Sequence, residues 1–172
     1  TKWNMRRYPL NMGRACMHVT VHQPELREPS LRLLRHVGLR GIAMVEFKRD
    51  DRDEQWKLIE VNARFSAANV VVARSGLDLA AFLYCRIAGL PYDMPDTYRA
   101  GVRLWYPLDD CFAFWHLHRR GELSLREWLS SLLHRQTLPR FEWLDPAPSV
   151  VFEAQRAYRV IRRALSRNGT AT

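Results

Sequence analysis

The amino-acid sequence predicts an α+β fold, in which an antiparallel sheet with flanking helices is followed by an α-helical C-terminal extension. Two β-rich runs separated by a polar turn, between residues 41 and 64, predict a hairpin. Apolar residues at helical spacing before and after it predict the flanking helices. A polar stretch with two prolines at 91–98, PYDMPDTY, predicts a boundary. We therefore expect two parts, residues 1–92 and residues 93–172.

The chain before the hairpin is predicted to form a strand and a helix. Residues 15–22 alternate as a strand does, which places His18 and His22 on one face. A histidine pair of this kind can bind a metal, but it more often has a structural role. Leucines at helical spacing within residues 31–37 predict a helix that ends at Gly38.

Two helices are predicted after the hairpin. Apolar residues within 67–73 suit a short buried helix that stops near Gly76. Asp78 stands where an N-cap favours a helix over 79–88, and Gly89 stands where such a helix ends. The apolar residues of this second helix are expected to be core: Leu79, Phe82, Leu83 and Ile87.

The extension is predicted to begin with one strand, GVRLWYP at residues 101–107, and to continue as helices. We expect one helix capped by Asp109 or Asp110, another over 125–134 capped by Ser124, and a long helix from Pro148 to about residue 166. Five aromatic residues are expected to pack the extension onto the sheet: Trp105, Phe112, Phe114, Trp115 and Trp128.

Composition argues against several functional classes. No run of 18 apolar residues occurs, so no membrane span is expected, and TKWNMRRYPL lacks the apolar centre of a signal peptide. Three widely spaced cysteines indicate a reducing, cytoplasmic compartment. The formal net charge of +9 would suit nucleic acid. However, the basic residues are spread along the chain, which is typical of a solvated surface or a docking face.

Two acids in the hairpin suggest chemistry. Strand alternation places Glu46 and Glu60 on one face, either directly opposite each other or diagonally offset, and also places Leu58 on that face. Facing carboxylates repel, and a bound cation would reverse that effect. With the amide oxygen of Asn62 they offer oxygen ligands alone, which favours Mg²⁺ or Mn²⁺ over zinc.

A magnesium ion bound by so few protein groups implies a nucleotide, since Mg²⁺ usually fills its remaining positions with water and phosphate oxygens. Arg64 is two residues past Asn62, and alternation would put it on the same face, where it can hold a phosphate or a carboxylate. The alternative is an ordinary hairpin with a solvated polar face, because E-x-N-x-R is a short motif.

Three runs resemble, in this order, the C-terminal half of an ATP-grasp domain of the carbamoyl-phosphate-synthetase-like and carboxylate–amine ligase branch: GLRGIAMVEFKRD, KLIEVNARFS and SGLDLAAFLYCRIAGLP. The resemblance covers roughly Arg6 to Pro91. It implies that Glu46, Glu60 and Asn62 hold the two magnesium ions of ATP. It also implies that Arg64 binds phosphate or an acyl-phosphate and is catalytic. Ala63 departs from the proline that many members carry.

The resemblance implies an ATP-dependent carboxylate–amine ligase that acts through an acyl-phosphate. Its cofactors would be ATP and Mg²⁺ or Mn²⁺, and its substrates a small carboxylate and an amine. The N-terminal half of such a domain, with its adenine-binding and phosphate-loop residues, is not found, so we expect a fragment that is inactive alone. The alternative is a non-catalytic scaffold or regulatory module that retains the fold and docks an acidic partner through its Arg-rich C-terminal helix.

Overall fold

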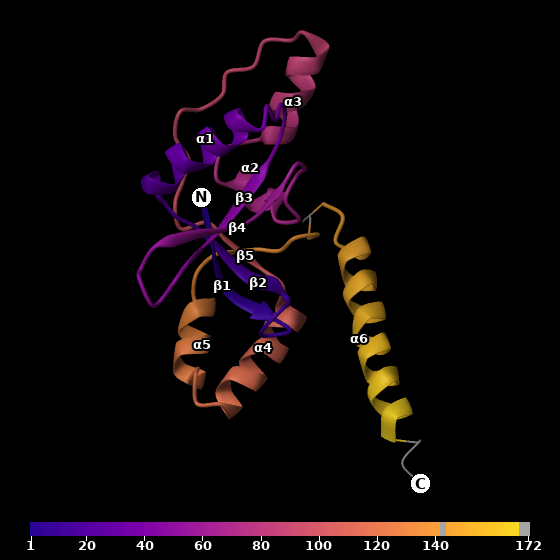
Figure 1. Ribbon diagram of the computed structural model, residues 1–172. Helices are drawn as coiled ribbons and strands as arrows, with labels where there is room; N and C mark the ends of the chain where they lie inside the picture. The colour runs from indigo at the N-terminus through magenta and orange to yellow at the C-terminus, as the bar shows by residue number, and fades with distance from the viewer. Residues whose placement is uncertain (142–143, 169–172) are drawn as a thin grey trace. The chain divides into compact units, whose positions relative to one another are not determined.

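A computed structural model describes residues 1–141 and 144–168, and it confirms an α+β fold (Figure 1). Residues 142–143 and 169–172 of the predicted extension lie outside this description. The elements in chain order are β1 (Lys2–Tyr8), β2 (Arg14–Thr20), the 3₁₀ turn η1 (Pro24–Leu26), α1 (Arg27–His36), β3 (Met44–Arg49), β4 (Trp56–Asn62), α2 (Asn69–Arg74), α3 (Leu79–Ala88), β5 (Arg103–Trp105), α4 (Pro107–Arg119), α5 (Leu125–Leu132), β6 (Gln136–Thr137) and α6 (Ala147–Asn168).

The chain divides into two compact units. Unit 1 contains Thr1–Trp3 and Val19–Val102, and unit 2 contains Asn4–His18 and Arg103–Thr172. This division differs from the predicted 1–92 and 93–172 mainly because most of β1 and β2 belongs with the later residues. Within the described ranges no helix combines the length and the apolar character needed to cross a membrane.

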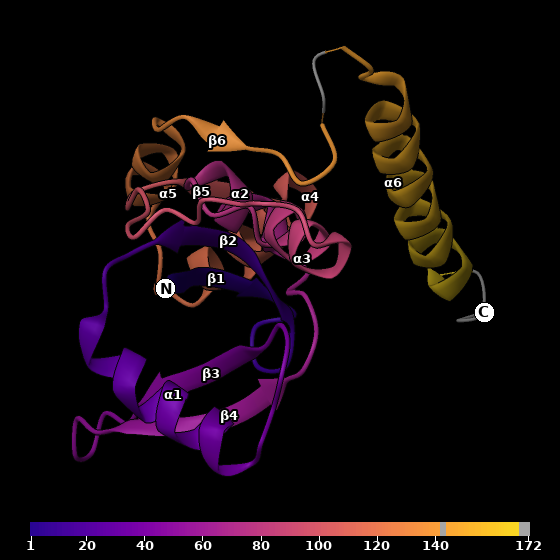
Figure 2. The same ribbon diagram turned by 90° about the horizontal axis from the view of Figure 1, so that it is seen from above.

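Unit 1 is built around the predicted hairpin. β3 and β4 run antiparallel (Figure 2), with Glu46 opposite Glu60 and Met44 opposite Asn62. The register then shifts, so that Phe47 pairs with Leu58. A bulge inserts one extra residue into a strand and breaks the alternation of faces there. The prediction that Leu58 shares the face of Glu60 was therefore wrong.

Helix α3 in unit 1 begins and ends as its caps predict. The Asp78 side chain accepts hydrogen bonds from the backbone N–H groups of Ala80 and Ala81. Gly89 ends the helix with a left-handed φ of 67°, which glycine adopts without steric cost. The predicted core role was wrong for Ile87, which is 79% exposed. Caps fix where a helix lies in the sequence, but not which side is covered.

Unit 2 contains most of a four-stranded sheet with the order β1-β2-β5-β6, in which β5 and β6 are parallel. The sequence predicted β2 and β5 but missed β1 and the two-residue β6. β1 is mostly polar, and its sequence has no clear apolar alternation. Among the described residues of this unit, the fully buried apolar ones are Cys16, Met17, Leu104 and Ala113.

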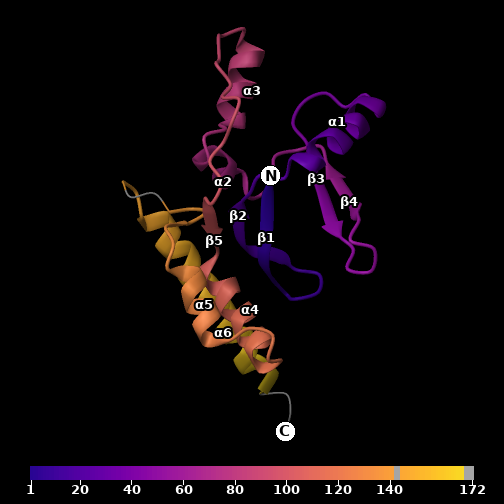
Figure 3. The same cartoon turned by 90° about the vertical axis from the view of Figure 1, so that its left-hand side faces the viewer.

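Helices α4 and α5 of unit 2 lie side by side (Figure 3), and Phe114 stacks on Trp128 with 4.5 Å between ring centroids. Ser124 caps α5 as predicted and forms a capping box with Glu127. Tyr106, rather than Asp109 or Asp110, holds the N-cap position of α4.

Asp110 is fully buried and organises unit 2. Its carboxylate accepts hydrogen bonds from Arg6 Nε at 2.6 Å and Arg6 Nη2 at 3.0 Å, and from the indole N–H groups of Trp105 at 3.0 Å and Trp128 at 2.9 Å. A buried charge is tolerated when it is paired and hydrogen-bonded in this way. Asp110 therefore joins β1, β5, α4 and α5.

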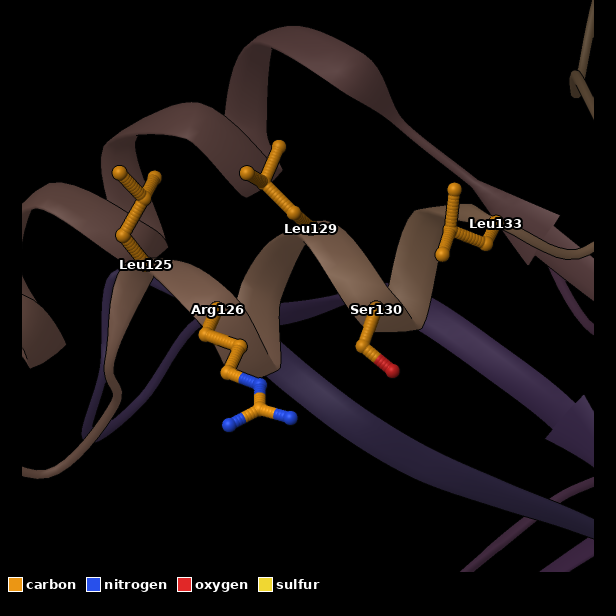
Figure 4. A pocket seen from close by; sticks show the side chains of 5 residues that line it. All are labelled: Leu125, Arg126, Leu129, Ser130 and Leu133. Atoms are coloured by element: carbon orange, nitrogen blue, oxygen red, sulfur yellow. The ribbon is translucent and has the colours of Figure 1, made fainter.

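One face of α5 remains exposed. Leu125, Leu129 and Leu133 recur every four residues and extend together from one side of the helix, opposite Arg126 and Ser130 (Figure 4). The three leucines are 50%, 48% and 86% exposed. They line an open apolar hollow that offers few polar groups to a ligand. Trp115 of α4 is also 56% exposed, so the predicted packing role was wrong for this residue.

Candidate functional site

The two predicted acids face each other directly in unit 1. Glu46 is the cross-strand partner of Glu60 in the β3–β4 ladder, and side chains of directly opposite residues have Cβ atoms about 4.5–5.5 Å apart. Glu46 is half-buried and Glu60 is exposed. Among the described residues, neither carboxylate has an ion-pair partner within 4 Å. Their mutual repulsion is therefore not offset by a direct protein ion pair.

Asn62 completes a set of oxygen donors. Its pairing with Met44 puts it on the same face as the two acids, one alternation further along β4. The amide nitrogen donates to Glu60 Oε1 at 2.7 Å, while the amide oxygen has no hydrogen-bond partner in the described part of the chain. This arrangement fixes the amide so that its oxygen is available to a ligand.

Lys2 is a neighbour of Glu46 that sequence reasoning missed. Burial lowers the pKa of the Lys2 ammonium, and the nearby Glu46 carboxylate opposes that shift. The residues on either side fix its position, because Trp3 packs edge-on against Trp56 and the amino group of Thr1 contacts the Tyr98 hydroxyl. Lys2 could have been expected near Glu46 only if strand β1 had been predicted from the sequence.

Arg64 lies beyond the strand. β4 ends at Asn62, and the Arg64 N–H donates to the Asn62 carbonyl at 2.9 Å, which turns the chain. Strand alternation therefore no longer determines where Arg64 points, and the reasoning that put it on the acidic face was wrong. Its exposed guanidinium donates to the Phe65 carbonyl at 3.3 Å and has no acidic partner among the described residues.

The donor set fits a hard divalent cation. No group of three or more His, Cys, Asp or Glu residues within the described ranges could hold a metal ion. However, two carboxylates and an amide oxygen are a typical contribution to magnesium, which is completed by water and phosphate. The set formed by Glu46, Glu60 and Asn62 includes no cysteine or histidine, which are the ligands that zinc prefers.

Comparison with family models gives a match within unit 1. Residues 19–91 match the ATP-binding domain of the carbamoyl-phosphate synthase L chain. Comparisons with curated proteins and with solved structures gave no match. The matched segment begins at Val19, later than the Arg6 expected from the resemblance, and it includes the whole β3–β4 hairpin and the helices α1 to α3. Residues 19–91 of this chain are therefore similar to part of an ATP-grasp domain.

Proposed function

We propose that this chain supplies the magnesium-binding part of an ATP-dependent carboxylate–amine ligase. The observation that carries the proposal is the direct opposition of Glu46 and Glu60, with Asn62 beside them, inside the segment that matches an ATP-binding domain. An ordinary structural hairpin has no use for facing acids, because like charges directly opposite each other are destabilising. A bound cation gives the pair a function.

In this proposal Glu46, Glu60 and Asn62 hold Mg²⁺ or Mn²⁺. When bound, the metal neutralises charge on the phosphate oxygens of ATP. The reaction transfers the terminal phosphoryl group of ATP to a substrate carboxylate, which yields ADP and an acyl-phosphate. An amine then attacks the acyl carbon, forms an amide and releases phosphate. Arg64 binds the phosphoryl or acyl-phosphate group through the planar fork of its guanidinium.

The proposal includes a partner and a compartment. The N-terminal half of an ATP-grasp domain would supply the adenine-binding and phosphate-loop residues that the sequence does not reveal. ATP, a small carboxylate and an amine would bind between the two halves. We also propose a reducing, cytoplasmic compartment, because Cys16, Cys85 and Cys111 are free thiols.

The metal site can be tested with Mn²⁺ as a paramagnetic probe in NMR spectra of the chain. We expect broadening of backbone amide signals centred on residues 44–47 and 60–62, and its loss in Glu60→Gln. Glu54→Gln is a matched control, because Glu54 lies in the same hairpin and is exposed. Equal broadening in the wild type and in Glu60→Gln would contradict the site and favour the scaffold alternative.

The need for a second half of the domain can be tested by calorimetry with Mg·ATP. We expect the chain alone to bind Mg·ATP weakly or not at all, because the proposal assigns the groups that hold the adenine base to the other half of the domain. Micromolar affinity would contradict the proposed partner, while leaving the metal ligands to be judged by the Mn²⁺ experiment.

A further inference from the structure

We propose that unit 2 carries a binding site for a small oxyanion, separate from the metal ligands and independent of the proposed ligase activity. The site is a cavity of about 220 Å³ formed by β1, the loop after β1 and the C-terminal end of α4. Its lining residues all belong to unit 2: Met5, Arg6, Arg7, Leu10, Asn11, Leu117, Arg120 and Glu122.

Arg6 contributes a fixed guanidinium. Its Nε and Nη2 atoms bind the carboxylate of Asp110, and Nη2 also contacts the sulfur of Met17. Nη1 has no hydrogen-bond partner among the described residues. It is also not a buried atom without a partner, because Gln136 Oε1 is the one such side-chain atom in the described part of the chain. Nη1 is therefore accessible. In our proposal it donates into the cavity that Arg6 lines, from a side chain already held in place.

Arg7 and Arg120 supply N–H donors that form no strong interaction with the described residues. Arg7 forms no hydrogen bond or ion pair with the described residues. Arg120 has a single 3.9 Å contact to Glu122, and both of these side chains are more than half exposed. Such an exposed pair contributes little. The charged groups at the cavity are three arginines (Arg6, Arg7 and Arg120) and two acids (Glu122 and, behind Arg6, Asp110). Their net charge is +1, which favours an anion.

The size and the walls of the cavity define the ligand class. Sites for drug-sized ligands usually measure about 300–1,000 Å³, so a cavity of about 220 Å³ suits a group of few atoms rather than a nucleotide. Arginine forks match the geometry of carboxylate and phosphate oxygens. Met5, Leu10 and Leu117 provide apolar walls that a short carbon skeleton can contact.

The experiment titrates the 172-residue chain with inorganic phosphate and, separately, with malonate at constant ionic strength, and it follows the backbone amide signals by NMR. We expect saturable shifts at residues 5–11 and 117–122 with at least one of the two anions. Arg120→Gln should weaken this binding about tenfold or more, the usual effect of losing a hydrogen bond to a charged group. The phosphate and malonate arms distinguish the two sources of the oxyanion.

Two further variants protect the test from folding effects. Arg126→Gln removes another exposed arginine of unit 2, which lies outside this cavity, and should leave binding unchanged. Glu122→Gln removes the opposing charge and should tighten binding a few-fold, an increase that misfolding could not produce. The proposal is overturned if neither anion gives saturable shifts, or if Arg126→Gln weakens binding as much as Arg120→Gln does.

Discussion

Asp110 in unit 2 and the pair Glu46 and Glu60 in unit 1 are acids in opposite environments. Asp110 is fully buried, and Arg6 and two indole N–H groups occupy its oxygens. Glu46 and Glu60 face each other without an ion pair in the described part of the chain. Acceptors filled by the protein stabilise a fold, whereas unfilled acceptors held side by side are suited to binding a cation.

Two arginines show the same contrast. Arg6 makes a bidentate ion pair with a buried carboxylate. Arg64 is exposed and donates one long hydrogen bond to a backbone carbonyl. A guanidinium without an ion pair can donate its N–H groups to a ligand. Most N–H donors of Arg6 are instead used in hydrogen bonds within the protein. The following predictions test whether this contrast separates structural from functional residues.

The largest expected effect is on stability, from Asp110→Ala. Removing this carboxylate leaves the buried Arg6 guanidinium without its counter-ion, and breaking a buried pair costs about 3–5 kcal/mol. We expect urea denaturation to show that loss of unfolding free energy. Asp145→Ala, an exposed position in the same unit, should change it by less than about 0.5 kcal/mol. Equal effects of the two variants would show that the Asp110 network is not what stabilises unit 2.

The next effect concerns the thiol beside Asp110. Burial, then the negative charge of Asp110, raises the pKa of Cys16 to about 12. We expect iodoacetamide at pH 8 to alkylate Cys16 at least about a hundredfold more slowly than the exposed Cys111, because the thiolate is the reactive form. Mass spectrometry of timed digests measures both rates. Similar rates in the folded protein would contradict the buried network.

The raised pKa of Cys16 also makes the stability of the folded protein depend on pH. The folded thiol keeps its proton above the ordinary cysteine pKa of about 8.5, so the folded state binds more protons than the unfolded state in this window. The contribution of Cys16 to stability is therefore complete below about pH 8.5 and is lost as the pH rises toward 12. Cys16→Ala should remove that part of the alkaline destabilisation.

Local sequence signals predicted the parts of this molecule that local interactions determine. Asp78 and Gly89 located α3, and the alternation around Glu46 and Glu60 predicted that they share a face. The pairing of Arg6 with Asp110 joins residues 104 positions apart, and no local pattern encodes it. For the same reason Lys2 was missed beside Glu46, and the bulge after Glu46 left no glycine or proline signal.

A further prediction concerns Arg64→Lys in the complete ligase that we propose. Lysine keeps the charge but loses the planar fork, so kcat should fall about ten- to a thousandfold if the contact tightens in the transition state. The melting temperature should stay the same, because the Phe65 carbonyl is the one hydrogen-bond partner of the Arg64 guanidinium in the described part of the chain. An unchanged kcat would remove Arg64 from the catalytic residues.

The smallest expected effect is the stability of Glu60→Gln without metal. Glutamine keeps an oxygen for the Asn62 amide but removes one of two facing charges. Like charges directly opposite on a sheet cost about 0.2–1 kcal/mol, so the variant should be as stable as the wild type or slightly more stable. The difference should shrink at high salt, because screening weakens repulsion between exposed charges.

Added Mg²⁺ should reverse this order. A cation that binds the folded wild type raises its stability by mass action, while Glu60→Gln lacks one ligand and should gain less. Thermal melts of the two proteins, each with and without millimolar Mg²⁺, measure all four stabilities, and Glu54→Gln should behave as the wild type does. If Glu60→Gln is destabilised by more than about 1 kcal/mol without metal, Glu60 supports the hairpin itself. The contrast with Asp110 would then fail, because both acids would be structural.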